Sequence, residues 1–314
     1  MNNHIGLAFS PERITYARFV LLNSEPEMKL NQTGGIEYTF PYEPFKFYNE
    51  VNVPNVGNLL RQTFDPIENN QATFSVSIES NLATLKRVIF PKDFDEKEQG
   101  LHITWEINES LPGSVEEYVY LRTDNRLEKE STVEELVIIV PKKVVSFINA
   151  VADYAQIKLT NLTLNALAAE VAFKKLLAND MADVLALYKL TSNLIETTIL
   201  HQGEFFTSFY EPLDTNESRN NDDIVLERLK IRIKTIENLF EQYKFEHSSV
   251  GHIFIYGDPI EDKLLEKIRK NISIQVDRFN PIDNIAKTDD YNTSGDQEAL
   301  QANLVECIGV ALDQ

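Results

Sequence analysis

The side chains that most often carry out chemistry in proteins are sparse in this chain of 314 residues. No two of its histidines lie one helical turn apart beside a carboxylate, which is the spacing expected of a zinc site. The five are His4, His102, His201, His247 and His252. The chain has no Gly-x-Ser-x-Gly nucleophile elbow and no Cys-x-x-Cys pair. We therefore predict no metal site and no catalytic residues.

Three other candidates have structural interpretations. Asp222 and Asp223 are interpreted as the negative charge at the start of a helix rather than as a catalytic pair. Gly34-Gly35 is interpreted as a hairpin turn rather than a phosphate loop. Cys307 lies in a helical apolar pattern, so we expect a buried packing residue. Since it is the single cysteine, an internal disulfide is excluded, which fits a reducing compartment.

The amino-acid composition and the net charge indicate which kinds of partner the protein can bind. Apolar residues make up 43% of the chain, and 49 acidic residues against 30 basic ones give a net charge of −19. This charge argues against binding nucleic acid or an anionic membrane surface, and it would steer a basic peptide toward the protein. No apolar run approaches the roughly 20 residues that span a bilayer. The amino end does not resemble a signal peptide, so we expect a cytoplasmic location without direct membrane insertion.

Each half of the chain begins with a strand-turn-strand-turn-strand unit, which predicts two lobes of related topology across a cleft. The predicted strands are His4 to Phe9, Arg13 to Leu22 and Ile36 to Phe40 in the first unit, and Asp183 to Leu190, Leu194 to His201 and Phe205 to Tyr210 in the second. Between the units, Leu82 to Val140 predicts an inserted β-α-β-β subdomain. The expected division is 1–81, 82–140, 141–181 and 182–314.

Several segments give narrower expectations. Lys287 to Asp296 is polar and is predicted as a loop, and the helix Gln297 to Leu312 is expected to pack on the lobe that begins at Ala182. Trp105 is interpreted as a core residue of the inserted helix, with a partner-binding aromatic as the alternative. The aromatic-rich connection Tyr38 to Tyr48 either covers the edge of a core or forms an adhesive groove.

This order of elements resembles the actin-like fold, an α/β fold of the ribonuclease H-like kind. More narrowly, it is similar to the PilM family, cytoplasmic proteins of type IV pilus assembly related to the cell-division protein FtsA. The matching segments cover nearly the whole chain but are architectural. They are Leu85 to Pro91, Trp105-Glu106, Leu111-Pro112, Val137 to Lys142, Val250 to Gly257, Asn280-Pro281 and Ile308 to Leu312.

The resemblance also locates three nucleotide-binding elements, and each departs from the family pattern. Ala8, Phe9 and Ser10 stand where an Asp-x-Gly-Ser phosphate loop is expected. Ala186 and Tyr188 stand where the second Asp-x-Gly belongs. The glycine cluster is reduced to Gly257 and Asp258 before Pro259. Because a phosphate cradle needs residues without a Cβ and magnesium needs carboxylates, we predict a pseudo-ATPase without a cofactor.

By the resemblance, the partner is the cytoplasmic tail of an inner-membrane pilus or secretion component. The groove implied for it lies between Arg13 to Phe64 and Leu82 to Val140. One alternative is an ATPase whose phosphate contacts are Ser10, Arg13, Thr191, Ser192 and Asn193. Another is a degenerate actin-like protein with a role unrelated to pili. The sequence leaves open whether the chain forms a homo-oligomer.

Overall fold

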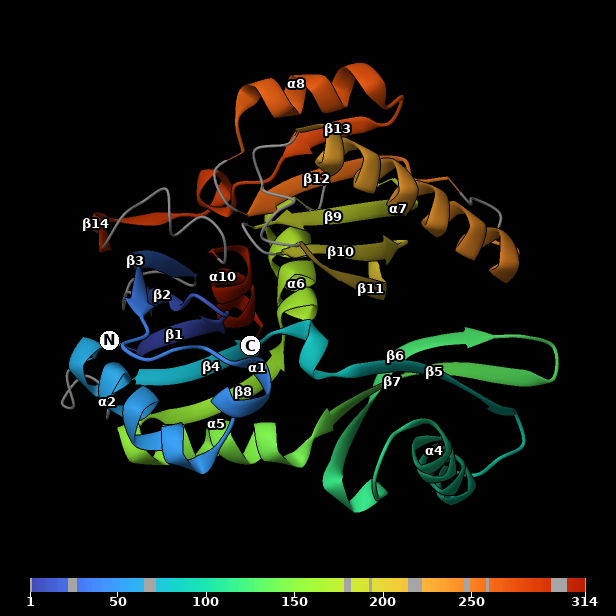
Figure 1. Cartoon of the computed structure of the whole chain (residues 1–314), viewed down its shortest axis with the longest axis horizontal. Helices are drawn as coiled ribbons and strands as arrows, with labels where there is room; N and C mark the ends of the chain where they lie inside the picture. Colours follow the sequence, from blue (N-terminus) through green and yellow to red (C-terminus); the bar gives the residue numbers. More distant parts are fainter. Residues whose placement is uncertain are drawn as a thin grey trace.

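The computed structural model describes residues 2–21, 27–64, 72–177, 182–191, 194–213, 222–245, 249–257, 260–294 and 304–313. Figure 1 shows two lobes, one above the other. The lower one is the first lobe and the upper one the second lobe. An arm formed by residues 84–141 projects from the first lobe (Figure 1). The described strands are β1 (Asn2–Phe9), β2 (Arg13–Leu21), β3 (Met28–Glu37), β4 (Ala72–Ile78), β5 (Thr84–Pro91), β6 (Tyr118–Glu128), β7 (Thr132–Pro141), β8 (Lys158–Leu164), β9 (Val184–Leu190), β10 (Leu194–His201), β11 (Glu204–Pro212), β12 (His252–Gly257), β13 (Gln275–Arg278) and β14 (Lys287–Ser294).

The described helices are α1 (Pro44–Phe47), α2 (Val53–Thr63), α4 (Glu96–Ser110), α5 (Lys142–Ala155), α6 (Asn165–Leu177), α7 (Asp222–Tyr243), α8 (Asp262–Asn271) and α10 (Leu304–Leu312), with short 3-10 turns η1 (Glu50–Asn52), η2 (Ser80–Leu82), η3 (Val115–Glu117) and η4 (Pro281–Asn284).

The two lobes share one strand pattern. The described strands of the first lobe form a six-stranded sheet in the order β14-β3-β2-β1-β4-β8, and those of the second lobe a five-stranded sheet in the order β11-β10-β9-β12-β13. In each lobe three consecutive strands pair antiparallel, and two later strands extend the sheet in parallel. Each sheet has apolar side chains on both of its faces, so helices pack against both faces of each sheet. The predicted pair of related lobes is confirmed.

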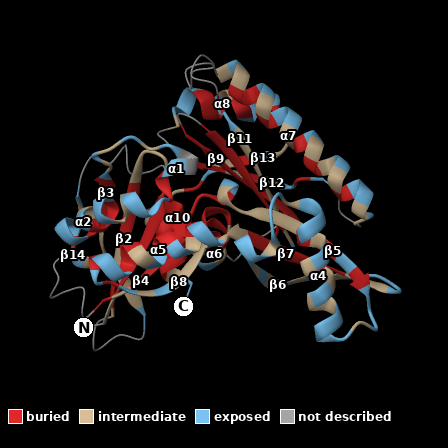
Figure 2. Ribbon diagram, turned by 60° about the horizontal axis from the view of Figure 1, so that its bottom comes forward, coloured by how far each residue is buried: buried red, intermediate tan, exposed pale blue. Residues whose placement is uncertain are grey.

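The layers follow from alternating side chains. On β1, Leu7 and Phe9 face a core shared with α2 and α5, whereas Ala8 faces α10. On β9, Tyr188 faces α7 and α8, whereas Leu187 faces α6. Helices α6 and α10 therefore form the layer at which the two lobes meet, and Figure 2 shows this layer buried.

The inserted segment is an antiparallel sheet, β5-β7-β6, crossed by α4, as predicted from Leu82 to Val140. In the second half of β7, successive side chains point to opposite faces of the sheet. Val137 and Ile139 on β7 pack with α4, whereas Ile138 and Val140 point to the opposite face, toward the first lobe. A capping box between Asp95 and Glu98 fixes the start of α4.

Three expectations about the first sheet were wrong. The third strand was predicted at Ile36 to Phe40, but β3 spans Met28–Glu37. Gly34 and Gly35 form no turn, because they lie inside β3 opposite Tyr16 and Thr15 of β2. A Cβ on Gly34 would meet the Tyr16 ring at 2.4 Å, so the glycine makes room for that ring. The polar segment predicted as a loop is the edge strand β14, which pairs in parallel with β3. An edge strand buries little, so its polarity concealed it.

The last helix differs in part from the expectation, since α10 packs mainly on the first lobe, and only its other side, with Val305 and Glu306, contacts the second. Its neighbours include α6, β1 and β2. The approach is close because two glycines remove side chains. A Cβ on Gly6 of β1 would lie 2.0 Å from the Cys307 carbonyl oxygen, and one on Gly309 would lie 1.8 Å from the Ala168 carbonyl oxygen. Cys307 itself is fully buried, as predicted.

We expect Gly309→Ala to lower the free energy of unfolding by about 1–3 kcal/mol, because the added methyl group pushes α10 away from the α6 backbone. Gly100→Ala is the matched control, since it is also a helical glycine but a Cβ there has no atom within 4 Å. Helix propensity alone should raise the stability of that variant by up to about 1 kcal/mol. Urea unfolding followed by circular dichroism measures both. Equal stabilisation of the two variants would contradict the close contact.

The open question about Tyr38 to Tyr48 is resolved in favour of a core edge. Phe47 and Tyr48 are buried, and both rings contact Phe147 of α5. Tyr38 and Tyr42 stack beside them, whereas the side chain of Phe45 lies outside the described residues.

Trp105 of the inserted helix is not buried. It is 54% exposed, so its interpretation as a core residue was wrong.

Candidate functional site

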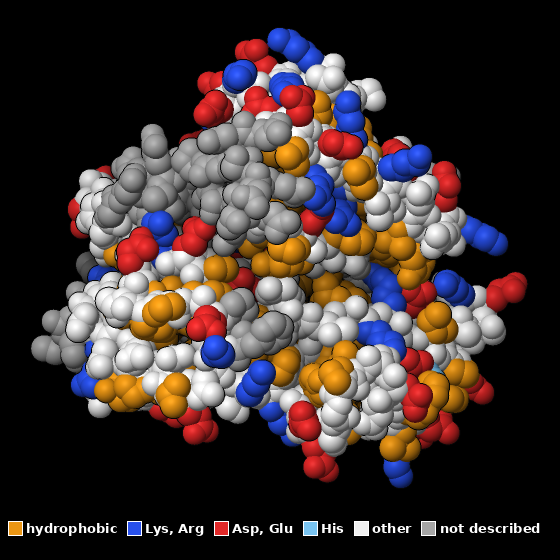
Figure 3. Space-filling view, in the orientation of Figure 1, with side chains coloured by type: hydrophobic (Ala, Val, Ile, Leu, Met, Phe, Trp, Pro, Cys, Tyr) orange, Lys and Arg blue, Asp and Glu red, His pale blue; other side chains and the backbone are white. Residues whose placement is uncertain are grey.

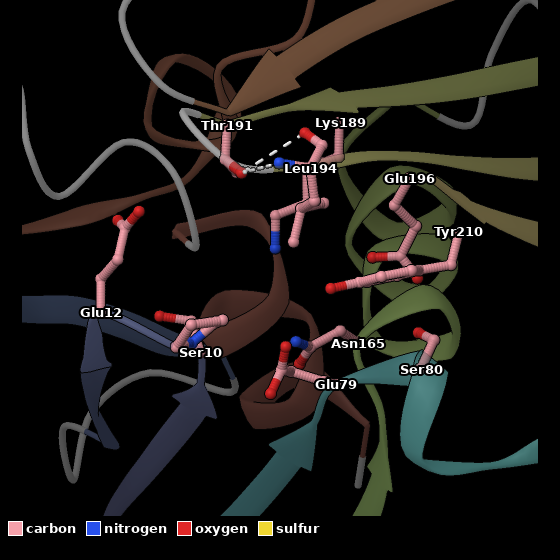
Figure 4. A pocket seen from close by; sticks show the side chains of 11 residues that line it. Ser10, Glu12, Glu79, Ser80, Asn165, Lys189, Thr191, Leu194, Glu196 and Tyr210 are labelled. Carbon is pink, nitrogen blue, oxygen red and sulfur yellow. Dashed lines mark hydrogen bonds between the residues drawn. The ribbon is translucent and has the colours of Figure 1, made fainter. Parts of the chain in front are cut away.

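A small cavity lies where the two lobes meet, at the ends of β1, β4, β9 and β10 (Figure 4). Its volume is about 10 Å3, which is room for about one water molecule. The first lobe contributes Ser10, Pro11, Glu12, Glu79, Ser80 and Asn165, and the second contributes Lys189, Thr191, Leu194, Glu196 and Tyr210. The lining of this cavity is therefore mostly polar and charged.

A buried ion pair crosses this boundary. Lys189 extends from β9 toward the middle of the cavity (Figure 4), and its Nζ lies 2.7 Å from Oε1 of Glu306 on α10. The two side chains are 3% and 0% exposed. The Tyr256 hydroxyl donates to the same carboxylate at 3.3 Å. Burial alone would lower the pKa of Lys189, but Glu306 and Glu196 raise it, so the lysine stays charged.

Two further buried carboxylates lie near this lysine. Burial raises the pKa of Glu196, and Lys189 and Ser80 partly oppose that rise. Burial likewise raises the pKa of Glu79 to about 7, against the opposing effects of Tyr42, which donates to its carboxylate, and of Lys189. One lysine thus faces three buried carboxylates, counting Glu306. The raised pKa values of Glu79 and Glu196 favour the neutral forms of both carboxyl groups, in the direction that lowers the excess negative charge around Lys189.

Glu79 should make stability fall as the pH rises from about 4.5 to about 7. Its pKa is raised in the folded state, so the folded chain binds more protons than the unfolded chain across this window, and the slope of unfolding free energy against pH is negative. Glu79→Gln keeps a group that accepts from Tyr42 and carries no charge. We expect this variant to be more stable than the natural chain at pH 8 by about 1–3 kcal/mol, with the difference disappearing near pH 4.5. Urea titrations at several pH values measure it. A difference independent of pH would contradict the assignment.

The structure places the predicted nucleotide-site positions in different surroundings. Ala8, Phe9, Ala186 and Tyr188 are buried in hydrophobic clusters. Ser10 lines the cavity and its hydroxyl donates to the Arg13 carbonyl oxygen at 2.8 Å. Gly257 has φ +120° and lies against the Leu190 carbonyl, so a glycine is required there. Asp258 lies outside the described residues.

The residues that the ATPase alternative names as phosphate contacts also lie in different surroundings. Ser10 and Thr191 both line the cavity. Arg13 instead forms an ion pair with Glu37 at 3.0 Å. Ser192 and Asn193 lie outside the described residues. In the part of the chain that the structure describes, no group of three histidines, cysteines or carboxylates could hold a metal ion.

The buried charges were missed in the sequence, although a signal for them was present. Strand β9 reads VLALYKL, β10 reads LIETTILH and α10 reads LVECIGVAL. Each is an apolar element that contains one internal charge, at Lys189, Glu196 and Glu306. Because a buried charge must be paired or neutralised, lone charges of opposite sign in apolar elements indicate that these elements meet.

A second hollow lies between the arm and the first lobe, with a volume of about 240 Å3 and a mostly apolar lining. The arm contributes Val119, Leu121, Ile138 and Val140, and the first lobe contributes Ile78, Val145, Leu162, Thr163, Leu164 and Leu167. We call it the arm groove. Its first-lobe wall consists of β8, α5 and the ends of β4 and α6, and none of the lining residues comes from 13–64. Val119 and Leu121 remain 42% and 62% exposed.

A third hollow of about 510 Å3 separates the arm from the second lobe. Polar contacts bridge it. The Asn125 side chain donates to the Phe205 carbonyl oxygen, and Arg87 donates to that of Phe206 at 2.9 Å. The Tyr243 hydroxyl of α7 donates to Glu134 of β7 at 2.7 Å. These contacts hold the arm against the second lobe and so restrict the movement of the arm wall of the arm groove.

No helix in the described part of the chain is long and apolar enough to cross a membrane. No family model matches the sequence, and no curated protein matches it either. Solved structures do match. A chain of a PilM–PilN type IV pilus biogenesis complex is similar with a TM-score of 0.72 at 13% identity, covering 99% of this chain and 98% of that one.

Two other similar structures share the architecture less closely. A protein of unknown function with an actin-like ATPase fold, from Bacteroides thetaiotaomicron, has a TM-score of 0.50 at 13% identity, over 92% and 93% of the two chains. The cytoplasmic domain of EpsL, an inner-membrane component of the type II secretion system of Vibrio cholerae, has a TM-score of 0.51 at 8% identity, over 99% and 94%. The chain therefore has the predicted actin-like fold, with two lobes and an inserted subdomain.

Proposed function

We propose that this protein is a non-enzymatic, actin-like assembly protein that binds a cytoplasmic segment of an inner-membrane pilus or secretion component in the arm groove. The observation that carries the proposal is the exposure of apolar side chains in a hollow. Leu121 is 62% exposed although it belongs to the groove lining, and an occupant would bury it. The volume of about 240 Å3 suits a few apolar side chains of a peptide.

Charge and similarity support the same class of partner. The net charge of −19 favours a segment with basic residues beside its apolar ones, because opposite charges accelerate association. One similar structure comes from a complex of PilM with PilN, and another is part of an inner-membrane secretion component. A shared fold does not imply a shared partner, so the proposal rests on the exposed apolar residues of the arm groove.

The space between the lobes supports a role without nucleotide turnover. The cavity of about 10 Å3 is far smaller than the roughly 300–1,000 Å3 of ordinary ligand sites. A triphosphate brought there would have to separate Lys189 from Glu306, and the buried Glu306 carboxylate would then face the anion without its partner. Like charges repel strongly when buried, so this carboxylate opposes the binding of an anion.

Two titrations test the proposal. Labelled synthetic peptides, taken from the cytoplasmic segments of inner-membrane assembly proteins encoded beside this chain, are titrated by fluorescence anisotropy. We expect at least one to bind saturably at micromolar concentrations. Calorimetry with ATP and magnesium should give no heat of binding in the same range. The proposal fails if no peptide binds, and the pseudo-ATPase part fails if ATP binds at micromolar concentrations.

A further inference from the structure

Helix α4 carries apolar residues on two opposite sides. Ile103 and Ile107 are buried against the sheet of the arm, where they complete its hydrophobic cluster. Leu101 and Trp105 are 62% and 54% exposed. At about 100° per residue, the exposed pair lies about 200° around the helix from the buried pair. Packing of α4 onto the sheet of the arm therefore does not explain why the residues at positions 101 and 105 are large and apolar.

The exposed tryptophan is held in place rather than loosely attached. Its ring stacks on His102, with centroids 5.6 Å apart and planes at 29°. The Nε2 of His102 in turn donates to the Ile89 carbonyl oxygen of β5 at 3.0 Å, and Phe94 contacts the imidazole edge-on. A rigid aromatic side chain loses little conformational entropy when it is covered, which is why tryptophan is frequent among the residues that dominate binding energy.

The surroundings of this pair are acidic. Between residues 92 and 110 the chain has six carboxylates and two lysines. The carboxylates are Asp93, Asp95, Glu96, Glu98, Glu106 and Glu109, of which Glu106 is paired with Lys86 of β5 at 2.6 Å. Two of the residues near the ends of the exposed stripe, Glu98 and Glu109, are themselves exposed. Figure 3 shows hydrophobic and acidic side chains side by side on the arm.

The acidic residues around Leu101 and Trp105 favour one kind of partner for this surface over two others. A second copy placed symmetrically on α4 would bring two acidic rims together, which is unfavourable. An anionic membrane surface would be repelled for the same reason. A partner with apolar residues and basic flanks meets both features. Because Leu101 and Trp105 are one helical turn apart, they form a ridge that fits beside the side chains of another helix.

We propose that the outward face of α4, centred on Leu101 and Trp105, is a docking surface for a basic amphipathic helix of a second partner protein. This surface and the arm groove lie on opposite faces of the β5-β7-β6 sheet, because α4 covers one face and the groove is lined from the other. Both can be occupied at once. The arm would then join two partners, and the α4 surface can bind whether or not the arm groove does.

Trp105 is the single tryptophan of the chain, so its emission reports on this surface directly. The probe is a synthetic amphipathic helix of leucine and lysine, and a leucine and glutamate helix with the same apolar face is its counterpart. We expect the lysine peptide to cause a saturable blue shift that weakens with added salt. Leu101→Gln should weaken its binding at least tenfold while leaving Trp105 in place.

Ile231→Gln is the matched control, because Ile231 is 57% exposed on α7, a helix of the second lobe. Circular dichroism verifies that both variants fold. The proposal is overturned if the two variants bind the lysine peptide equally, or if the glutamate peptide binds as well as the lysine peptide. It is also overturned if anionic phosphatidylserine vesicles alone shift the emission, or if sedimentation shows a self-association that Leu101→Gln abolishes. Labelled groove peptides are titrated separately, so failure here is distinguishable from failure of the proposed function.

Discussion

Replacing Lys189 with methionine is expected to lower the free energy of unfolding by about 3–5 kcal/mol at pH 7. The substitution preserves most of the side-chain volume but removes the buried positive charge. Glu306, which is fully buried and lies 2.7 Å from the Lys189 ammonium, would lose its ionic partner, and Glu196 would lose the charge that lowers its pKa. Both lobes contribute to this cluster, so the contact between them should loosen as well.

The double variant Lys189→Met with Glu306→Leu should recover much of the loss, since an apolar pair of similar size can replace a buried ion pair at little cost. Lys174→Met is the control. Lys174 also pairs with carboxylates, Glu170 and Glu204, but it is 35% exposed, so its loss should cost less than about 1 kcal/mol. Urea unfolding monitored by circular dichroism gives the free energies. If Lys189→Met costs no more than Lys174→Met, the cluster does not hold the lobes together.

Replacing Leu121 with glutamate is expected to weaken binding of the groove peptide by about 100-fold, which corresponds to about 2.7 kcal/mol. In the free protein Leu121 is 62% exposed, so a charged residue there costs little stability. In the bound state the carboxylate would be buried among Val119, Ile138 and Leu164 without a partner. An unpaired charge in an apolar site carries a large desolvation cost.

Fluorescence anisotropy with the labelled peptide measures this change. Ile231→Glu introduces the same charge at a similarly exposed position on α7, so it corrects for the general effect of one more negative charge on a basic peptide. Thermal unfolding of both variants should match that of the natural chain within a few degrees. Equal binding by the two variants would place the peptide outside the arm groove.

The sequence determined the architecture because the architecture depends on local, repeated signals. Alternating apolar residues and turn residues predicted the two meanders, and a change in pattern predicted the inserted β-α-β-β segment. Local start signals also stand at the right places, because Pro141 and Asp95 are the residues immediately before α5 and α4. The single cysteine, in an apolar helical pattern, is buried as predicted.

What the sequence did not determine depends on contacts between distant segments. Strand β14 is polar, and only its pairing with β3 makes it a strand. Helix α10 follows the second lobe in the chain but packs mainly on the first, because Gly6 and Gly309 permit a close approach that apolar periodicity does not reveal. Trp105 fits the pattern of a core residue, yet Ile103 and Ile107 already fill that core.

The candidate site is also a feature that depends on contacts between distant segments of the chain. Lys189, Glu196 and Glu306 are separate charges in three apolar elements, and the sequence does not state that they meet. Which wall closes the arm groove was likewise decided by the position of β8 and α5, far along the chain from the arm. Local patterns fix which face of an element is apolar. The covering partner for each face is fixed only when all elements pack together, since burial is a property of the whole chain.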